Sequence, residues 1–223
     1  MGAMIELTAK DGFTLGAYKA EPTGKAKGGL VVIQEIFGVN HHIRAVADRF
    51  AAQGYAVVAP ALFDRAERGI DLGYDEGTIK RGIELRSKVK LEDTLLDIAA
   101  AIGELKGVGK IGVVGYCWGG SLAFLSATRL DGLACAVGYY GGMIAAHAEE
   151  KLKVPVLLHF GERDHGIPLS DVEKVKAARP EVQIYTYPAD HGFSCDERGS
   201  FDKPSHQKAL ERTLAFFKQH LGG

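Results

Sequence analysis

The segment from residue 113 to residue 121 constrains this chain more than any other. It reads V-V-G-Y-C-W-G-G-S, a short apolar strand followed at once by residues that favour a helix. Glycines stand two positions before and two positions after Cys117. A turn this sharp strains the backbone of its central residue, and side chains at the flanking positions would collide. The pattern therefore predicts a tight strand-to-helix turn with the Cys117 sulfur at its tip, facing the first N–H groups of the helix.

This turn has two interpretations. In the first, it presents Cys117 as a nucleophile, as sharp turns with this glycine spacing do in some hydrolytic enzymes. In the second, the glycines only allow close packing, and Cys117 is an ordinary small buried residue. A motif match stays a hypothesis until its structural context supports it. The choice therefore depends on the residues at the ends of the other strands.

Segments of strand and helix length alternate along the whole chain. Two strands near 5–7 and 15–18, joined through Asp11-Gly12, predict an antiparallel N-terminal hairpin. Further strands are expected at 30–33, 56–59, 111–114, 133–137, 154–160 and 182–187, and helices at 43–50, 91–105, 170–178 and 210–221. This alternation predicts an α/β fold, with a mostly parallel central sheet between helices on both faces. We expect one domain over residues 1–223.

Two local features qualify this pattern. Ser170 followed by Glu173 predicts a capping box at the start of the 170–178 helix. The stretch from Leu62 to Val89 is polar and weakly periodic, with four glycines. We expect loops there and a short helix near 75–88, covering an active site.

Composition excludes several classes of function. The 223 residues include 27 basic and 28 acidic ones, so no basic surface for nucleic acid is expected. No apolar run approaches the roughly 20 residues of a membrane span, and no apolar signal segment is visible at the N-terminus. A cytoplasmic protein without a membrane partner is the expectation, either a monomer or a small homo-oligomer. The three cysteines are an odd number without metal-ligand spacing, so neither disulfides, a metal nor another cofactor is expected.

Residues with catalytic chemistry follow two later strands. Asp164 follows the 154–160 strand, and His191 follows the 182–187 strand. Ligands of open parallel sheets bind at the carboxyl ends of strands, so these positions should converge with Cys117. Taken alone, Asp164 could be an ordinary turn residue, and His191 could be an ordinary surface histidine. Together, their order of nucleophile, acid and histidine is the one used by α/β-hydrolases, and predicts a catalytic triad.

Each triad member has a chemical task. A thiol with a pKa of about 8.5 is only partly ionised at neutral pH, so a nearby imidazole helps to form the thiolate and later protonates the leaving group. A carboxylate on the far ring nitrogen fixes the tautomer and stabilises the imidazolium. The other seven histidines need no catalytic role: His41, His42, His147, His159, His165, His206 and His220.

Glu35 directly follows the 30–33 strand and has apolar neighbours on both sides. Burying such a carboxylate without a partner is costly. It is therefore either an exposed loop residue or an acid placed beside the nucleophile. In the second case the N–H groups of Ile36 and Trp118 would form an oxyanion hole.

With these residues assembled, the chain resembles the dienelactone hydrolase (carboxymethylenebutenolidase) family of α/β-hydrolases almost from end to end. The resemblance is carried by segments 34–40, 115–120, 137–141, 161–165 and 190–193. It implies that Cys117, Asp164 and His191 are the triad. It also implies that Glu35 hydrogen-bonds the resting thiol until substrate displaces it.

Two positions depart from the family pattern. Family members bind a substrate carboxylate with two arginines, and one of these follows the catalytic histidine by four residues, where this chain has Cys195. Arg198 is a possible substitute. Arg81 is the nearest candidate for the other arginine, and Tyr140 is a second expected substrate contact. A thiol does not replace the planar guanidinium as a carboxylate partner, so dienelactone specificity is open.

The leading hypothesis is a hydrolase of small lactones or carboxylic esters that works through an acyl-cysteine intermediate. A thioesterase or general carboxylesterase on the same site is the first alternative. A redox-responsive thiol protein is the second, because an accessible thiolate is also readily oxidised. A catalytically silent binding scaffold is the third, and the complete triad argues against it.

Overall fold

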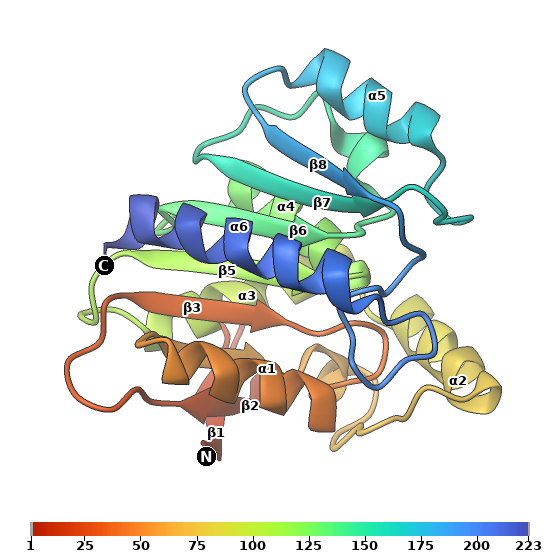
Figure 1. The fold of residues 1–223 in the computed structure, drawn as a ribbon. Helices are drawn as coiled ribbons and strands as arrows, with labels where there is room; N and C mark the ends of the chain where they lie inside the picture. The colour runs from red at the N-terminus through yellow and green to blue at the C-terminus, as the bar shows by residue number, and fades with distance from the viewer. Residues whose placement is uncertain (1, 223) are drawn as a thin grey trace.

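The computed structural model describes residues 2–222, which form one eight-stranded sheet with helices on both faces (Figure 1). The strands are β1 (Ala3–Thr8), β2 (Thr14–Ala20), β3 (Gly29–Ile33), β4 (Ala56–Pro60), β5 (Ile111–Tyr116), β6 (Cys135–Tyr139), β7 (Val156–Gly161) and β8 (Gln183–Tyr187). The α-helices are α1 (His41–Ala52), α2 (Glu76–Lys88), α3 (Leu91–Glu104), α4 (Trp118–Arg129), α5 (Leu169–Ala178) and α6 (Lys203–Leu221). Two short 3₁₀ helices, η1 (Leu62–Arg65) and η2 (Ile144–His147), complete these elements.

The sheet has the strand order β1-β2-β4-β3-β5-β6-β7-β8. Strand β2 runs antiparallel to both β1 and β4, and the remaining pairs are parallel. The predicted α/β-hydrolase fold with an antiparallel N-terminal hairpin is confirmed. Because the parallel strands point the same way, the loops after β3, β5, β7 and β8 meet at one edge of the sheet, where α2 also lies (Figure 1).

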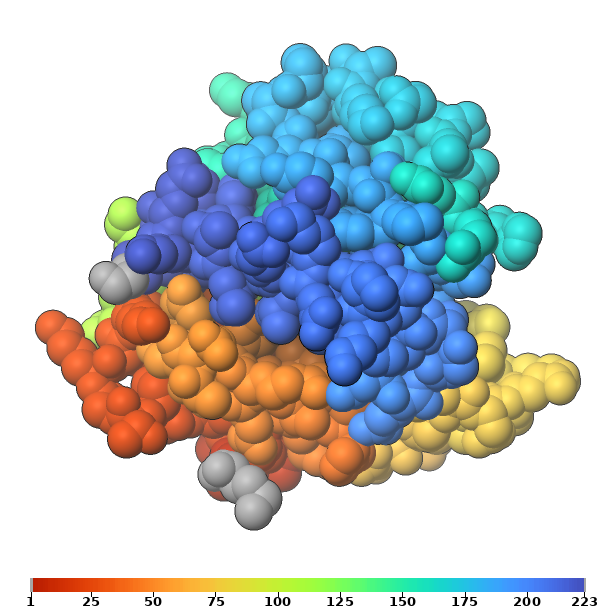
Figure 2. Space-filling model, viewed as in Figure 1, coloured from red at the N-terminus to blue at the C-terminus, as the bar shows by residue number. Residues whose placement is uncertain are grey.

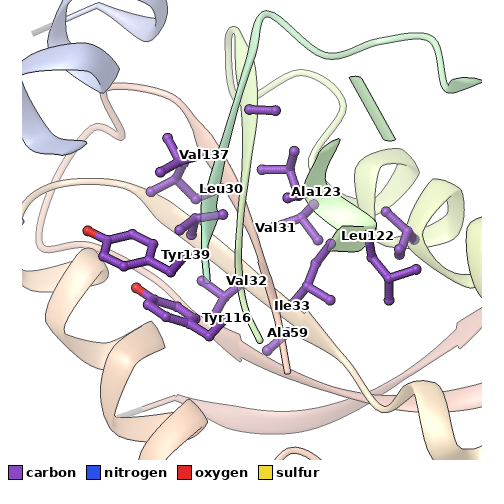
Figure 3. Close-up of a cluster of buried hydrophobic side chains, with 14 of the residues drawn as sticks. Leu30, Val31, Val32, Ile33, Ala59, Tyr116, Leu122, Ala123, Val137 and Tyr139 are labelled. Atoms are coloured by element: carbon purple, nitrogen blue, oxygen red, sulfur yellow. The ribbon is translucent and has the colours of Figure 1, made fainter. Parts of the chain in front are cut away.

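Helices cover the central strands on both sides. In β3 and β4 every residue is buried, as expected of strands covered on two faces. Figure 3 shows Val31 and Ile33 on the side of Leu122 in α4, whereas Val32 lies on the side of Tyr116. On that second side α1 and α6 lie next to each other, as Figure 2 shows in orange and blue. The central strands are therefore held from both faces.

Some predicted boundaries were wrong. Strand β6 begins two residues later than expected, and β4 includes Pro60, which pairs with Ala17 of the antiparallel neighbour β2. Helix α5 begins at Leu169, directly after Pro168, and has no side-chain cap. The predicted capping box is wrong because Ser170 already lies inside the first turn.

The predicted helix over the active site is confirmed as α2, which begins after the capping side chain of Asp75. Asp75 accepts hydrogen bonds from the N–H groups of Gly77 and Thr78 at 2.9 and 3.1 Å. Within residues 2–222, no helix combines the length and apolar composition needed to cross a bilayer.

Candidate active site

The turn between β5 and α4 holds Cys117 in a strained conformation. Its φ is 57° and its ψ is −117°, a region that residues with a Cβ rarely adopt. Its N–H donates to the carbonyl of Tyr139 at 3.0 Å, which fixes the turn against β6. Its own carbonyl accepts from the N–H of Gly120 at 3.0 Å, inside the first turn of α4. The thiol is thereby presented at the start of a helix.

The glycines around this turn are sterically required. A Cβ on Gly115 would lie 1.9 Å from the carbonyl oxygen of Gly119. A Cβ on Gly119 would in turn lie 2.5 Å from the carbonyl oxygen of Ile33 in β3. Real Cβ atoms do not come this close to backbone, so α4 can approach the sheet here only because side chains are absent.

Asp164 and His191 are brought together from the loops after β7 and β8. Nδ1 of His191 donates to Oδ2 of Asp164 at 2.6 Å. The other Asp164 oxygen, Oδ1, accepts from the N–H of Gly166 at 2.9 Å, and the carboxylate is 1% exposed. This arrangement orients the imidazole and leaves its second nitrogen for Cys117.

The two neighbours of His191 change its acidity. Burial lowers the pKa of the imidazole, but hydrogen bonds with the Asp164 carboxylate and the Cys117 sulfur, and the negative charge of both groups in their ionised forms, outweigh that effect and raise the pKa to about 10. The charged imidazolium is therefore the favoured form at neutral pH. It lies between a fixed carboxylate and the candidate nucleophile.

The two expected oxyanion donors lie at the same place. Ile36 and Trp118 both line the cavity that contains Cys117 and His191. Among the residues that the structure describes, neither N–H has a hydrogen-bond acceptor. Trp118 is also the first residue of α4, where the helix dipole is positive. Both N–H groups are free to bind a developing negative charge.

Glu35 is buried, as its position after β3 predicted, with only 1% of its side chain exposed. Its hydrogen-bond partners differ from the expected one. Oε1 accepts from Nη1 of Arg198 at 3.1 Å, and Oε2 accepts from the Tyr74 hydroxyl at 3.2 Å. Within residues 2–222, the Glu35 carboxylate has no hydrogen bond with Cys117. The expected resting pair is therefore wrong, because the positive charge of Arg198 holds this carboxylate instead.

The two expected substrate contacts also need correction. Arg81 lies outside the cavity and pairs with Glu67 and Glu84, so its charge is already neutralised. Tyr140 is fully buried, and its ring centre lies 5.0 Å from that of His191. It packs against His191 and does not line the cavity.

The cavity beside Cys117 has a volume of about 300 Å³. Its wall is mostly apolar and contains Ile83 and Arg86 of α2, together with Met143 and Ile167. Nη2 of Arg86 donates to Sδ of Met143 at 3.1 Å, and no carboxylate of residues 2–222 forms an ion pair with it. Arg86, rather than Arg81, is therefore the cation available to a ligand in this cavity.

Sequence reasoning missed Arg86, although a signal was present. Gly82 lies in the middle of the predicted helix, where glycine is unfavourable. A Cβ there would lie 2.1 Å from the carbonyl oxygen of Ile36, so α2 packs directly on the loop that follows β3. Ile83 and Arg86 follow by one and four positions, and both line the cavity.

Comparison with known proteins agrees with this arrangement. The model of the dienelactone hydrolase family matches residues 15–221. A carboxymethylenebutenolidase of Pseudomonas putida is 33% identical over 223 residues, covering 95% of this chain and 94% of the relative. An Azospirillum brasilense protein described as a candidate carboxymethylenebutenolidase is 36% identical over 236 residues, covering 98% and 99%.

Among solved structures, one from Klebsiella pneumoniae subsp. pneumoniae, described as a candidate dienelactone hydrolase, has a TM-score of 0.86. It is 30% identical and covers 98% of this chain and 99% of its own. Sequence and structure thus agree over nearly the whole length. The chain belongs to the dienelactone hydrolase family, a family of hydrolases with the α/β-hydrolase fold.

Proposed function

We propose that this protein hydrolyses small lactones or carboxylic esters that carry a second, free carboxylate. The observation that supports this most is the position of His191, which bonds Asp164 and adjoins Cys117 at a cavity containing the unpaired Arg86. Nucleophile, base and orienting acid are the minimum set for acyl transfer through a covalent intermediate.

In the first half of the reaction, the Cys117 thiolate attacks the substrate carbonyl carbon. The carbonyl oxygen becomes negatively charged and accepts hydrogen bonds from the N–H groups of Ile36 and Trp118. The imidazolium of His191 then gives its proton to the departing alkoxide as the C–O bond breaks. In a lactone this alkoxide remains attached to the acyl group, so the ring opens on the enzyme.

In the second half, water attacks the acyl-cysteine thioester. Neutral His191 takes a proton from that water, and the C–S bond breaks to release the carboxylic acid and the Cys117 thiolate. Arg86 would hold the second carboxylate of the substrate throughout, because its guanidinium is the charged donor of the cavity without an acidic partner.

A substrate panel with matched variants tests the proposal. Cys117→Ala should abolish turnover of an activated ester and of a lactone, whereas Cys135→Ala, which removes a buried thiol of β6, should retain it. Mass spectrometry of a slow ester should detect an acyl group on the peptide containing Cys117. Full turnover by folded Cys117→Ala would contradict the proposal.

Arg86→Gln tests the substrate class. A charge-assisted hydrogen bond contributes about 1.5–3 kcal/mol, so we expect roughly a 10- to 100-fold loss of kcat/KM for the carboxylated substrate. Neutral esters should be unaffected, and Arg81→Gln should leave both activities unchanged because Arg81 lies outside the cavity. If Arg86→Gln lowered kcat/KM equally for the carboxylated and the neutral substrates, the proposal that the substrate carries a free carboxylate would be wrong.

A further inference from the structure

A second cluster of reactive side chains lies behind the catalytic cavity. It consists of Glu35 after β3, His42 in the first turn of α1, and Cys195 in the loop after His191. All three are buried, and the carboxylate oxygen, ring nitrogen and sulfur that they offer lie within 4.8 Å of one another. No step of the proposed reaction uses any of these three side chains.

His42 is the independent sign that this cluster is built for a ligand. Its side chain is fully buried, yet Nε2 has no hydrogen-bond partner among the described residues. Its other nitrogen, Nδ1, donates to Oδ1 of Asp196 at 2.9 Å, and Nη1 of Arg49 donates to Oδ2 of Asp196 at 2.8 Å. A buried polar atom without a partner costs about 1–3 kcal/mol, so an orphan nitrogen needs an explanation.

The hydrogen bond to Asp196 determines what the free nitrogen can do. It places the proton on Nδ1, which leaves the lone pair of Nε2 free. Histidines that bind metals commonly have this arrangement, with a carboxylate on the far nitrogen that fixes the ring.

The three donor atoms match one class of metal ion. Sulfur, imidazole nitrogen and carboxylate oxygen together suit Zn²⁺ and similar borderline-soft divalent ions rather than Mg²⁺ or Ca²⁺. Bonds of about 2.0–2.3 Å in a tetrahedral site place ligand atoms roughly 3.3–3.8 Å apart. The observed spacing of up to 4.8 Å therefore requires an inward movement of about 1 Å.

We propose that Cys195, His42 and Glu35 form a binding site for a thiophilic divalent cation of the Zn²⁺ type. On binding, the Cys195 thiol loses its proton to solvent and a metal–sulfur bond forms. Oε2 of Glu35 leaves the Tyr74 hydroxyl for the metal, while Oε1 keeps its bond with Arg198. Arg198 and Tyr74 are the other polar groups at this carboxylate, and Tyr74 also adjoins Cys195.

Cobalt(II) is the probe of choice, because a thiolate ligand gives it a distinctive near-ultraviolet charge-transfer band. The experiment uses untagged Cys117→Ser protein, so that the catalytic thiol cannot bind the metal. We expect one Co²⁺ per chain, the thiolate band, and release of one proton. Zn²⁺ should displace the cobalt and remove the band.

Variants locate the site independently of activity. In the Cys117→Ser background, Cys195→Ser should abolish the band, whereas Cys135→Ser should keep it. Asp196→Asn touches no ligand atom, but it should weaken Co²⁺ binding about 10- to 100-fold by releasing the His42 ring. The proposal is wrong if folded Cys117→Ser shows no thiolate band, or if the band survives without Cys195.

Discussion

At the scale of single residues, the acidity of His191 is the property most open to measurement. Burial lowers the pKa of the imidazole, but the Asp164 carboxylate and the ionised Cys117 sulfur raise it to about 10. The protonated form therefore persists through neutral pH and is lost as the pH rises through this raised pKa. In the proposed reaction the leaving alkoxide takes its proton from His191, so kcat/KM should fall on that alkaline limb.

Asp164→Asn tests this assignment. The amide carries no charge, so the pKa of His191 should drop and the alkaline limb of the kcat/KM profile should move to lower pH, with turnover reduced by orders of magnitude. Asp190→Asn is the matched control, because Asp190 is adjacent to His191 but half exposed and lies 3.9 Å from Arg163. If the alkaline limb of the kcat/KM profile stayed at the same pH in Asp164→Asn, the limb would report the titration of a group other than His191.

The Glu35–Arg198 pair gives a second residue-scale prediction. Glu35 is 1% exposed and Arg198 is 19% exposed, so an unpaired carboxylate is costlier here than an unpaired guanidinium. Arg198→Gln should therefore lower the free energy of unfolding more than Glu35→Gln, by about 3 kcal/mol against about 2 kcal/mol. The double variant should lose less than the sum of the two, as measured by urea denaturation. Strict additivity would mean that the pair contributes no coupling energy.

The sequence predicted the residues at strand ends but not their partners. Cys117, Asp164, His191 and Glu35 were identified because each follows an apolar strand, and the sheet topology brings such positions together. The sequence pattern did not predict that Arg198 pairs with Glu35. The two residues are 163 positions apart, and only the folded loop after β8 brings them together. The choice of Arg81 failed, and Arg86 was missed, for a related reason: only the packing of α2 decides which of its arginines lines the cavity.

At the scale of elements, the packing of α2 on the loop after β3 depends on Gly82. Gly82→Ala places a Cβ 2.1 Å from the Ile36 carbonyl oxygen, so the helix must move away from the loop. We expect a loss of about 1–3 kcal/mol in the free energy of unfolding, and reduced turnover because Ile36 and Arg86 shift together.

Gly103→Ala in α3 is the matched control. No atom lies within 4 Å of a Cβ built there, so the usual helical preference for alanine should apply. The free energy of unfolding should rise by about 0.5–1 kcal/mol, with unchanged activity. If Gly82→Ala behaved in the same way, the contact between α2 and Ile36 would have no influence on the site.

Element types were predictable where the hydrophobic pattern was strong, and boundaries were less so. Strands β3 and β5 were predicted from continuous apolar runs, and helix α3 was predicted from the helical spacing of its apolar residues. Ser170 and Glu173 had the correct spacing for a capping box, but Pro168 has the φ of −63° that precedes a helix and α5 starts directly after it. The N-cap therefore lies at Pro168, two residues before the Ser170 that the capping-box pattern predicted.

At the scale of the whole molecule, the candidate site combines segments from across the chain. The loop after β3 supplies Ile36, the proposed oxyanion donor, the turn after β5 supplies Cys117, and the loops after β7 and β8 supply Asp164 and His191. A site of this kind depends on global stability, because no single element holds it. Ion pairs that join distant segments away from the cavity should therefore affect stability without changing the chemistry.

The clearest such pair is Arg65–Asp97. Arg65 in η1 donates from Nε and Nη2 to the two oxygens of Asp97 in α3, both at 2.8 Å, and from Nη1 to Asp11 in the β1–β2 turn at 2.9 Å. Asp97 is fully buried and Arg65 is 12% exposed. Three segments far apart in sequence thus converge on one guanidinium.

Asp97→Ala should remove about 3–5 kcal/mol from the free energy of unfolding, because Arg65 is left partly buried with only the Asp11 contact. Glu92→Ala, on an exposed face of the same helix, should cost no more than about 1 kcal/mol through the helix dipole. Urea denaturation measures both values. In the folded fraction of Asp97→Ala, kcat/KM should equal the wild-type value, since neither residue lines the cavity. The stability loss of Asp97→Ala could instead be as small as that of Glu92→Ala. In that case the attraction between Arg65 and Asp97 would be no larger than the free-energy cost of removing both charged groups from water.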